Sequence, residues 1–207
     1  MGTYPPDPMN RGRNYEIDET CRISNHKNIT NKNSKKKTMT PIVSIIMGST
    51  SDLPIMEKAM KFLDEQQIPF EVNALSAHRT PEAVETFARQ AEGRGVKVII
   101  AAAGMAAALP GVIAASTTLP VIGVPIKGSV LDGVDALYSI LQMPPGIPVA
   151  TVAINGAMNA AILAMQILAL SDTEIAQRFA EYKASLCKKI EKANIDLKEV
   201  KYKFKTN

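Results

Sequence analysis

The chain of 207 residues is long enough for one α/β domain, and a hydrophobic content of 46% can supply a substantial core. Its formal net charge is +4, but residues 1–40 hold eight basic and four acidic side chains, which leaves sixteen of each sign in residues 41–207. The basic balance therefore belongs to the first forty residues. It is poor evidence that the domain itself binds nucleic acid, and no nucleic-acid partner is expected.

Residues 1–40 have the composition of a segment that does not fold. They are rich in Asn, Lys, Arg, Thr and Pro and show no sustained period of 2 or 3.6 residues. We predict a disordered basic N-terminal extension that is solvated rather than used as a binding arm. Met39, directly before the first expected strand, is an alternative start of translation.

Signals for a membrane, a disulfide or a metal are weak. No apolar segment typical of a secretory signal follows the first residue, and the longest apolar run, residues 157–170, is short for a bilayer span and interrupted by Asn159 and Gln166. Cys21 and Cys187 give neither a disulfide framework nor metal-ligand spacing. The expected protein is cytoplasmic, without a membrane partner or a metal.

The first expected strand is residues 43–47, a short apolar run that Gly48 ends. A helix is expected from about Pro54, because proline is favourable in a first turn, and Ser51 or Asp52 can cap its exposed amides. Apolar side chains then recur at three- and four-residue spacing, as in an amphipathic helix, at Ile55, Met56, Ala59, Phe62 and Leu63.

The same pattern recurs along the chain. Strands with successive apolar residues are buried on both faces, and intervening helices supply the crossovers of a parallel sheet. Residues 41–171 are therefore predicted to form a three-layer α/β/α domain with a doubly wound parallel sheet, flavodoxin-like or Rossmann-like in strand order. Further strands are expected at 70–75, 96–101, 120–124 and 149–154, and further helices from Pro81 after a Thr80 cap and at 106–115, 132–142 and 156–170.

The last two helices have distinct patterns. The helix at 156–170 is apolar nearly all round, so covering one face of a sheet would leave apolar surface in water, and we expect a partner subunit to cover the rest. Residues 172–207 predict a charged amphipathic helix to about Leu197 followed by a Lys-rich tail, packed on the domain or extending from it.

Two polar loops carry the chemistry. In open α/β sheets, ligands bind outside the carboxyl ends of the strands, where the loops at 48–52 and 76–81 are expected. Backbone amides, a helix dipole and the hydroxyls of Ser49, Ser51 and Ser76 can hold a phosphate, and Arg79 adds a bidentate cation. Asp52 is an acceptor better suited to a ribose hydroxyl.

His78 is one of two histidines, and the other, His26, lies in the extension. If imidazole chemistry occurs in the domain, His78 carries it. Each polar residue also has a plainer role as a helix cap or a surface ion pair, but two such loops around the domain's one histidine favour a phosphate-ester site with one acid/base. The chain has no P-loop and no G-x-G-x-x-G fingerprint, residues 48–52 lack the second glycine of a hydrolase elbow, and a transition-metal site is not expected.

These motifs together resemble the class I N5-carboxyaminoimidazole ribonucleotide mutases of purine biosynthesis. The resemblance covers about residues 42–170 and runs through several motifs in fixed order, which are far more specific together than singly. They are Gly-Ser-x-Ser-Asp at 48–52, Ser-Ala-His-Arg-Thr-Pro at 76–81, Ala-x-Leu-Pro-Gly at 107–111, and the runs at 133–139 and 142–149.

The resemblance implies a flavodoxin-like subunit, a homo-octamer and a cofactor-free reaction that moves a carboxylate from the exocyclic amine of the substrate to ring carbon 4. It implies that His78 is the catalytic acid/base. Ser49, Asp52 and Arg79 are then expected to bind the ribose phosphate part of the substrate, with Ser76 beside the phosphate.

The implied mechanism passes through CO2, which needs a small, dry cavity. The run of small residues at 101–108 is suited to line one, although close helix–sheet packing would explain it as well. The full set of expected lining residues is Gly48, Ser51, Ala77, Ala103, Gly104, Met105 and Leu109.

One position departs from the family pattern, because Ala108 stands where many bacterial members have a second histidine. This favours His78 as the sole proton carrier. It leaves open the related reaction of class II enzymes, direct carboxylation of aminoimidazole ribonucleotide by CO2. A non-catalytic nucleotide-binding module, which would have no need of His78, is the third hypothesis.

Overall fold

The computed structural model describes residues 39–206, so the predicted extension lies outside the described residues except for its last two positions. Strands and helices alternate along the described chain as predicted, although several ends differ. They are β1 (Val43–Met47), α1 (Leu53–Glu65), β2 (Phe70–Ala74), α2 (Pro81–Gln90), β3 (Val98–Gly104), α3 (Leu109–Ser116), β4 (Val121–Ile126), α4 (Val134–Leu141), β5 (Ala150–Thr151), α5 (Ala157–Ala169) and α6 (Thr173–Glu199).

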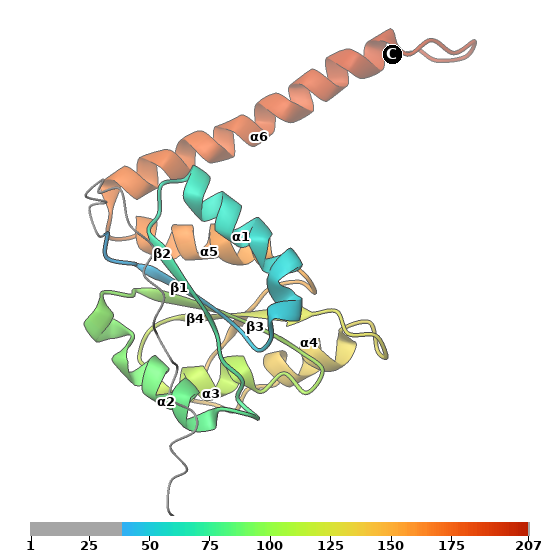
Figure 1. Ribbon diagram of the computed structural model, residues 1–207. Coiled ribbons are helices and arrows are strands. Elements are labelled where there is room, and N and C mark those ends of the chain that lie inside the picture. The colour runs from blue at the N-terminus through green and yellow to red at the C-terminus, as the bar shows by residue number, and fades with distance from the viewer. Residues whose placement is uncertain (1–38, 207) are drawn as a thin grey trace, which may run out of the picture. The chain divides into compact units, whose positions relative to one another are not determined.

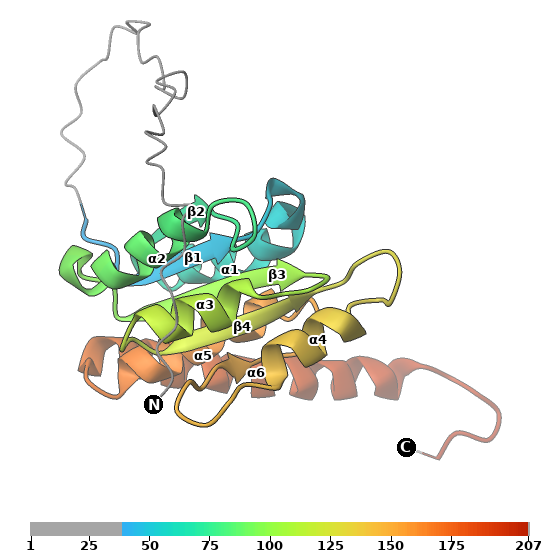
Figure 2. The same ribbon diagram turned by 90° about the horizontal axis from the view of Figure 1, so that it is seen from below.

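The strands form one parallel five-stranded sheet in the order β2-β1-β3-β4-β5. Helices α1 and α5 cover one face and α2, α3 and α4 cover the other (Figures 1 and 2). The predicted three-layer α/β architecture is confirmed, and the order is that of the flavodoxin-like fold. Strands β1, β3 and β4 are almost completely buried because they have a strand on each side and helices above and below.

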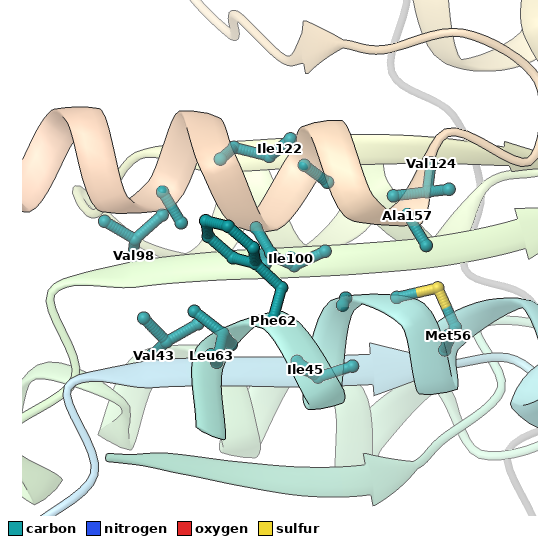
Figure 3. Packing of buried hydrophobic residues seen from close by; sticks show 14 of the residues in the cluster. Val43, Ile45, Met56, Phe62, Leu63, Val98, Ile100, Ile122, Val124 and Ala157 are labelled. Carbon is teal, nitrogen blue, oxygen red and sulfur yellow. The ribbon is translucent and has the colours of Figure 1, made fainter. Parts of the chain in front are cut away.

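The core on the first face lies between α1, α5 and the central strands (Figure 3). Phe62 of α1 is buried there, beside Ile100 of β3, and its ring makes a T-shaped contact with that of Tyr182 from α6 at a centroid distance of 5.0 Å. Burying a side chain of this size contributes about 1.5–3 kcal/mol. The contact joins α6 to the same core.

Helix α5 corrects one expectation. Its apolar surface does not need a partner subunit, because α1 and α6 pack against the sides that the sheet leaves open. The residues of α5 that remain exposed are the polar Asn159 and Gln166, together with Met158. A sequence pattern that is apolar all round therefore reflects three neighbours within one subunit.

Helix α6 begins at a capped amino terminus and runs beyond the domain. The carboxylate of Asp172 accepts hydrogen bonds of 3.0 Å from the backbone of Glu174 and Ile175. The first turns of α6 pack through Ile175, Phe179 and Tyr182, and residues 186–204 are exposed throughout. No helix of the described residues has the length and hydropathy needed to cross a membrane.

Candidate functional site

A cavity of about 620 Å³ opens at the carboxyl ends of β1, β2, β3 and β4. It lies over the point where the strand order reverses, between β1 and β3, which is where ligands bind in doubly wound sheets. Its size is typical of a site for a small ligand. The structure brings all twelve residues singled out from the sequence to its wall: Gly48, Ser49, Ser51, Asp52, Ser76, Ala77, His78, Arg79, Ala103, Gly104, Met105 and Leu109.

The loop after β1 is a short 3-10 turn, Thr50–Asp52, that leads directly into α1. Asp52 occupies the N-cap position of α1, as predicted, but its side chain makes no capping hydrogen bond. The side chain of Ser49 caps the 3-10 turn instead, by accepting a 3.3 Å hydrogen bond from the Ser51 backbone. The Asp52 carboxylate instead accepts a 3.2 Å hydrogen bond from the Ser51 hydroxyl. Several polar groups thus meet at a helix amino terminus, an arrangement that favours an anion.

The loop after β2 is held by its own side chains. Thr80 occupies the predicted N-cap position of α2, but its side chain makes no capping hydrogen bond to that helix. Its hydroxyl accepts from the Ser76 backbone at 3.0 Å and donates to the Ser76 carbonyl at 3.1 Å. The Ser76 hydroxyl accepts from the Arg79 backbone at 3.3 Å. This closed turn presents His78 and Arg79, both exposed, at the cavity.

Arg79 joins the two loops, because its guanidinium donates a 3.0 Å hydrogen bond to the carbonyl of Gly48. A guanidinium has five donors in a planar fork, so this bond leaves others for a ligand. Asp52, on the same side of the cavity, is 7% exposed and is the only buried charged side chain of the described residues. Its burial raises the pKa of the carboxyl, and hydrogen bonds from Ser51 and Ser49 offset this only in part.

The wall over β3 differs from the prediction. Residues 102–104 continue the strand, since Gly104 pairs with Ile126 of β4, and the helix expected from 106 begins only at Leu109. Between them, Met105 has a left-handed backbone with φ of 55° and exposes its side chain. Small residues line this part of the cavity, as expected for the run at 101–108.

Sequence reasoning missed the wall contributed by β4. Residues Ile126, Lys127, Gly128 and Ser129 line the cavity, and Lys127 adds a cation opposite the two polar loops. No local motif marks these residues, and only the neighbourhood of β3 and β4 could have revealed them. Among the described residues, no three His, Cys, Asp or Glu side chains converge as metal ligands would.

Comparison with known proteins supports the resemblance. A family model described as AIR carboxylase matches residues 42–189. This chain belongs to the AIR carboxylase family. N5-carboxyaminoimidazole ribonucleotide mutase of Pyrococcus horikoshii is 52% identical over 164 residues, which cover 79% of this chain and 93% of the relative.

Other relatives carry a different name or add structural support. Phosphoribosylaminoimidazole carboxylase of Candida glabrata is 56% identical over 142 residues, which cover 69% of this chain but only 25% of that longer protein. The crystal structure of PurE from Treponema denticola superposes with a TM-score of 0.70 at 35% identity, over 77% of this chain and 99% of that one. The fold and the family therefore agree.

Proposed function

We propose that this protein is an N5-carboxyaminoimidazole ribonucleotide mutase, which forms 4-carboxy-5-aminoimidazole ribonucleotide in purine biosynthesis. The observation that carries the proposal is the convergence of the motif residues on one cavity around His78, in a chain that belongs to the AIR carboxylase family. Relatives with this name match almost their whole length.

The reaction is a balanced transfer. The bond between the exocyclic nitrogen and the carboxylate carbon breaks, its electron pair stays on nitrogen, which takes up a proton, and CO2 is released into the cavity. Ring carbon 4 then bonds to CO2 and loses its proton, which restores the aromatic ring. One proton enters at nitrogen and one leaves at carbon, so the imidazole of His78 suffices as acid and base, and no cofactor is consumed.

The two polar loops bind the ribose phosphate in this proposal. Arg79 and the hydroxyls of Ser49 and Ser76 hold the phosphate, because charge-assisted hydrogen bonds and helix amino termini favour an anion there. Asp52 accepts a hydrogen bond from the ribose. The small residues after β3 line the part of the cavity that would hold the CO2, and exclusion of water from it when the nucleotide is bound would limit the escape of CO2.

The proposal includes a homo-octamer in the cytoplasm. What supports an assembly is the α4 surface, a stripe of exposed apolar side chains on α4 and the loop before it: Val130, Leu131, Val134, Tyr138 and Leu141. Val130 is 81% and Tyr138 59% exposed, unusual values for residues of this size, and adjacent apolar side chains in water favour association. The cytoplasmic location rests on cysteine usage alone, and Cys187 is exposed and unpaired.

Direct carboxylation of aminoimidazole ribonucleotide by CO2 is the second candidate, favoured by the name of the fungal relatives and by Ala108 in the cavity wall. One assay separates the two. The purified full-length protein is given the carbamate nucleotide alone, or aminoimidazole ribonucleotide with bicarbonate and CO2, and carboxylated product is followed without added cofactor. Rapid conversion of the carbamate is the expected result; conversion only with CO2 would identify a carboxylase, and none with either would favour a binding module.

A further inference from the structure

Lys127 is a charged residue of the cavity that the motif residues do not account for. It is the first residue after β4, and the cavity wall includes it together with Gly128 and Ser129. The charged side chains of that wall are otherwise Asp52, Arg79 and, when protonated, His78. Lys127 is thus one of two permanent cations in the cavity, and the other, Arg79, lies in the phosphate-binding loops.

The strand order separates these two cations. From β1, which leads into the loop at 48–52, the sheet continues to β3 and then β4, which leads into Lys127. Neighbouring strands lie about 4.8 Å apart, so the two strand ends are roughly 10 Å from one another. A ribonucleotide carries its phosphate and its base on opposite sides of the ribose. With the phosphate over β1 and β2, the base extends over β3 toward Lys127.

The backbone of Lys127 is fixed in place. Its N–H donates a 2.9 Å hydrogen bond to the side chain of Asn155, whose own N–H donates to the Pro125 carbonyl at 2.8 Å. On the other side, Gly133 has φ of 88°, and a β-carbon there would come within 3.0 Å of the Lys127 α-carbon. The lysine therefore leaves the strand in a set direction.

The amine, in contrast, is held loosely. It lies 2.9 Å from the Asp132 carboxylate, but the two side chains are 55% and 76% exposed. An ion pair exposed to that much water contributes little to stability. The Lys127 amine can therefore leave Asp132 and pair with a ligand carboxylate in the cavity at little cost in free energy. Lysine has three donors on a flexible stem, which suits it to such an exchange.

We propose that Lys127 binds the migrating carboxylate, and so gives the site its preference for carboxylated over uncarboxylated aminoimidazole ribonucleotide. This rests on the proposed function. The carboxylate is anionic in substrate and product but becomes neutral as CO2 forms. Lys127 therefore stabilises the bound nucleotides more than the transition state, so its loss raises KM and kcat together and changes kcat/KM less than either.

The test compares two ligands that differ only in the carboxylate. Dissociation constants of 4-carboxy-5-aminoimidazole ribonucleotide and of aminoimidazole ribonucleotide are measured by calorimetry with the full-length protein and with Lys127→Met, which keeps the stem but not the charge. We expect Lys127→Met to weaken binding of the carboxylated ligand at least about tenfold, the loss of one charge-assisted hydrogen bond, and to leave the other ligand unaffected.

Three variants complete the design. Lys127→Arg keeps a cation and retains the preference, whereas Asp132→Asn removes the competing carboxylate and retains or strengthens it. Lys97→Met, an exposed lysine at the opposite end of β3, is the matched control and changes neither affinity. Equal weakening of both ligands by Lys127→Met and Asp132→Asn would overturn the inference in favour of a structural ion pair, with the mutase intact. Failure of the wild type to bind either ligand would overturn the proposed function as well.

Discussion

The guanidinium of Arg79 donates a 3.0 Å hydrogen bond to the carbonyl of Gly48, thirty-one residues earlier in the chain. The two residues belong to the loops after β2 and β1, which are neighbouring parallel strands in register. The same side chain that offers a cation to the cavity therefore also holds together the two loops that would surround a phosphate.

Arg79→Ala should act mainly on substrate binding. It removes a charge-assisted contact to the phosphate and loosens the junction with Gly48, so we expect KM to rise about tenfold or more, with a smaller effect on kcat. Steady-state kinetics with the carbamate nucleotide measure both. Arg89→Ala is the matched control, because Arg89 lies on α2, outside the cavity, and pairs with Glu85. An unchanged KM for Arg79→Ala would refute the assignment.

His78→Asn should separate chemistry from binding. The side chain is exposed at the cavity, outside the buried core, so we expect its replacement to leave the fold intact. We expect turnover to fall by about 10²–10⁴-fold, the usual contribution of a general acid/base, while calorimetric affinity for the product nucleotide stays close to that of the wild type. Retained turnover would favour another proton carrier, and loss of binding would show that His78 holds the nucleotide.

The sequence predicted most of the polar side of the cavity because its signals are local. Gly48 ends an apolar run, Pro54 and Pro81 mark first helical turns, and the intervening polar residues must then lie at strand ends. The caps were less predictable. Asp52 and Thr80 occupy the predicted N-cap positions of α1 and α2, but neither side chain makes a capping hydrogen bond, because each bonds to a neighbour in its own turn.

The opposite wall depends on tertiary pairing. Residues 102–104 lie beyond the predicted end of the strand but continue β3, because all three pair with β4 and Ala102 also pairs with β1. Lys127 lines the cavity only because β4 lies beside β3, and no local sequence motif around Lys127 predicts this pairing. The partners of α5 were missed for the same reason, since α1, which contacts both α5 and α6, lies far from them in the sequence.

The α4 surface should carry an intersubunit contact. Leu141→Asp places a charge where an apolar side chain is half-exposed, and burying that charge at an interface would be costly. We expect the variant to elute as a smaller species than the wild type in size-exclusion chromatography with light scattering. Leu170→Asp makes the same change at an apolar residue 87% exposed at the end of α5 and should keep the wild-type mass. Identical masses for all three proteins would show that the α4 surface does not form an intersubunit contact.

Asp52→Asn should raise stability at neutral pH and lower activity. Burial raises the pKa of the carboxyl above its ordinary 3.8, so the native state binds its proton more readily than the unfolded state. Stability is therefore lost as the pH rises from the pKa of Asp52 in the unfolded state to its higher pKa in the native state. Above that interval the wild type bears the full free-energy cost of the buried charge. Asn removes that penalty and still accepts from the Ser51 hydroxyl. A gain on the order of 1 kcal/mol is expected at pH 7, about 2–4 °C in Tm.

The dependence on pH identifies the cause of that gain. It should shrink as pH falls toward 3.8, where the wild-type carboxyl becomes protonated in both states. The difference in the free energy of unfolding is measured by urea unfolding of both proteins between about pH 4 and pH 7, a range that covers much of the titration of an aspartate. Asp64→Asn changes an exposed aspartate near the end of α1, the helix that Asp52 precedes, and should leave stability nearly unchanged. A variant that is less stable than the wild type at pH 7 would mean that hydrogen bonds to the ionised Asp52 outweigh its desolvation, and that the carboxylate supports the loop rather than straining it.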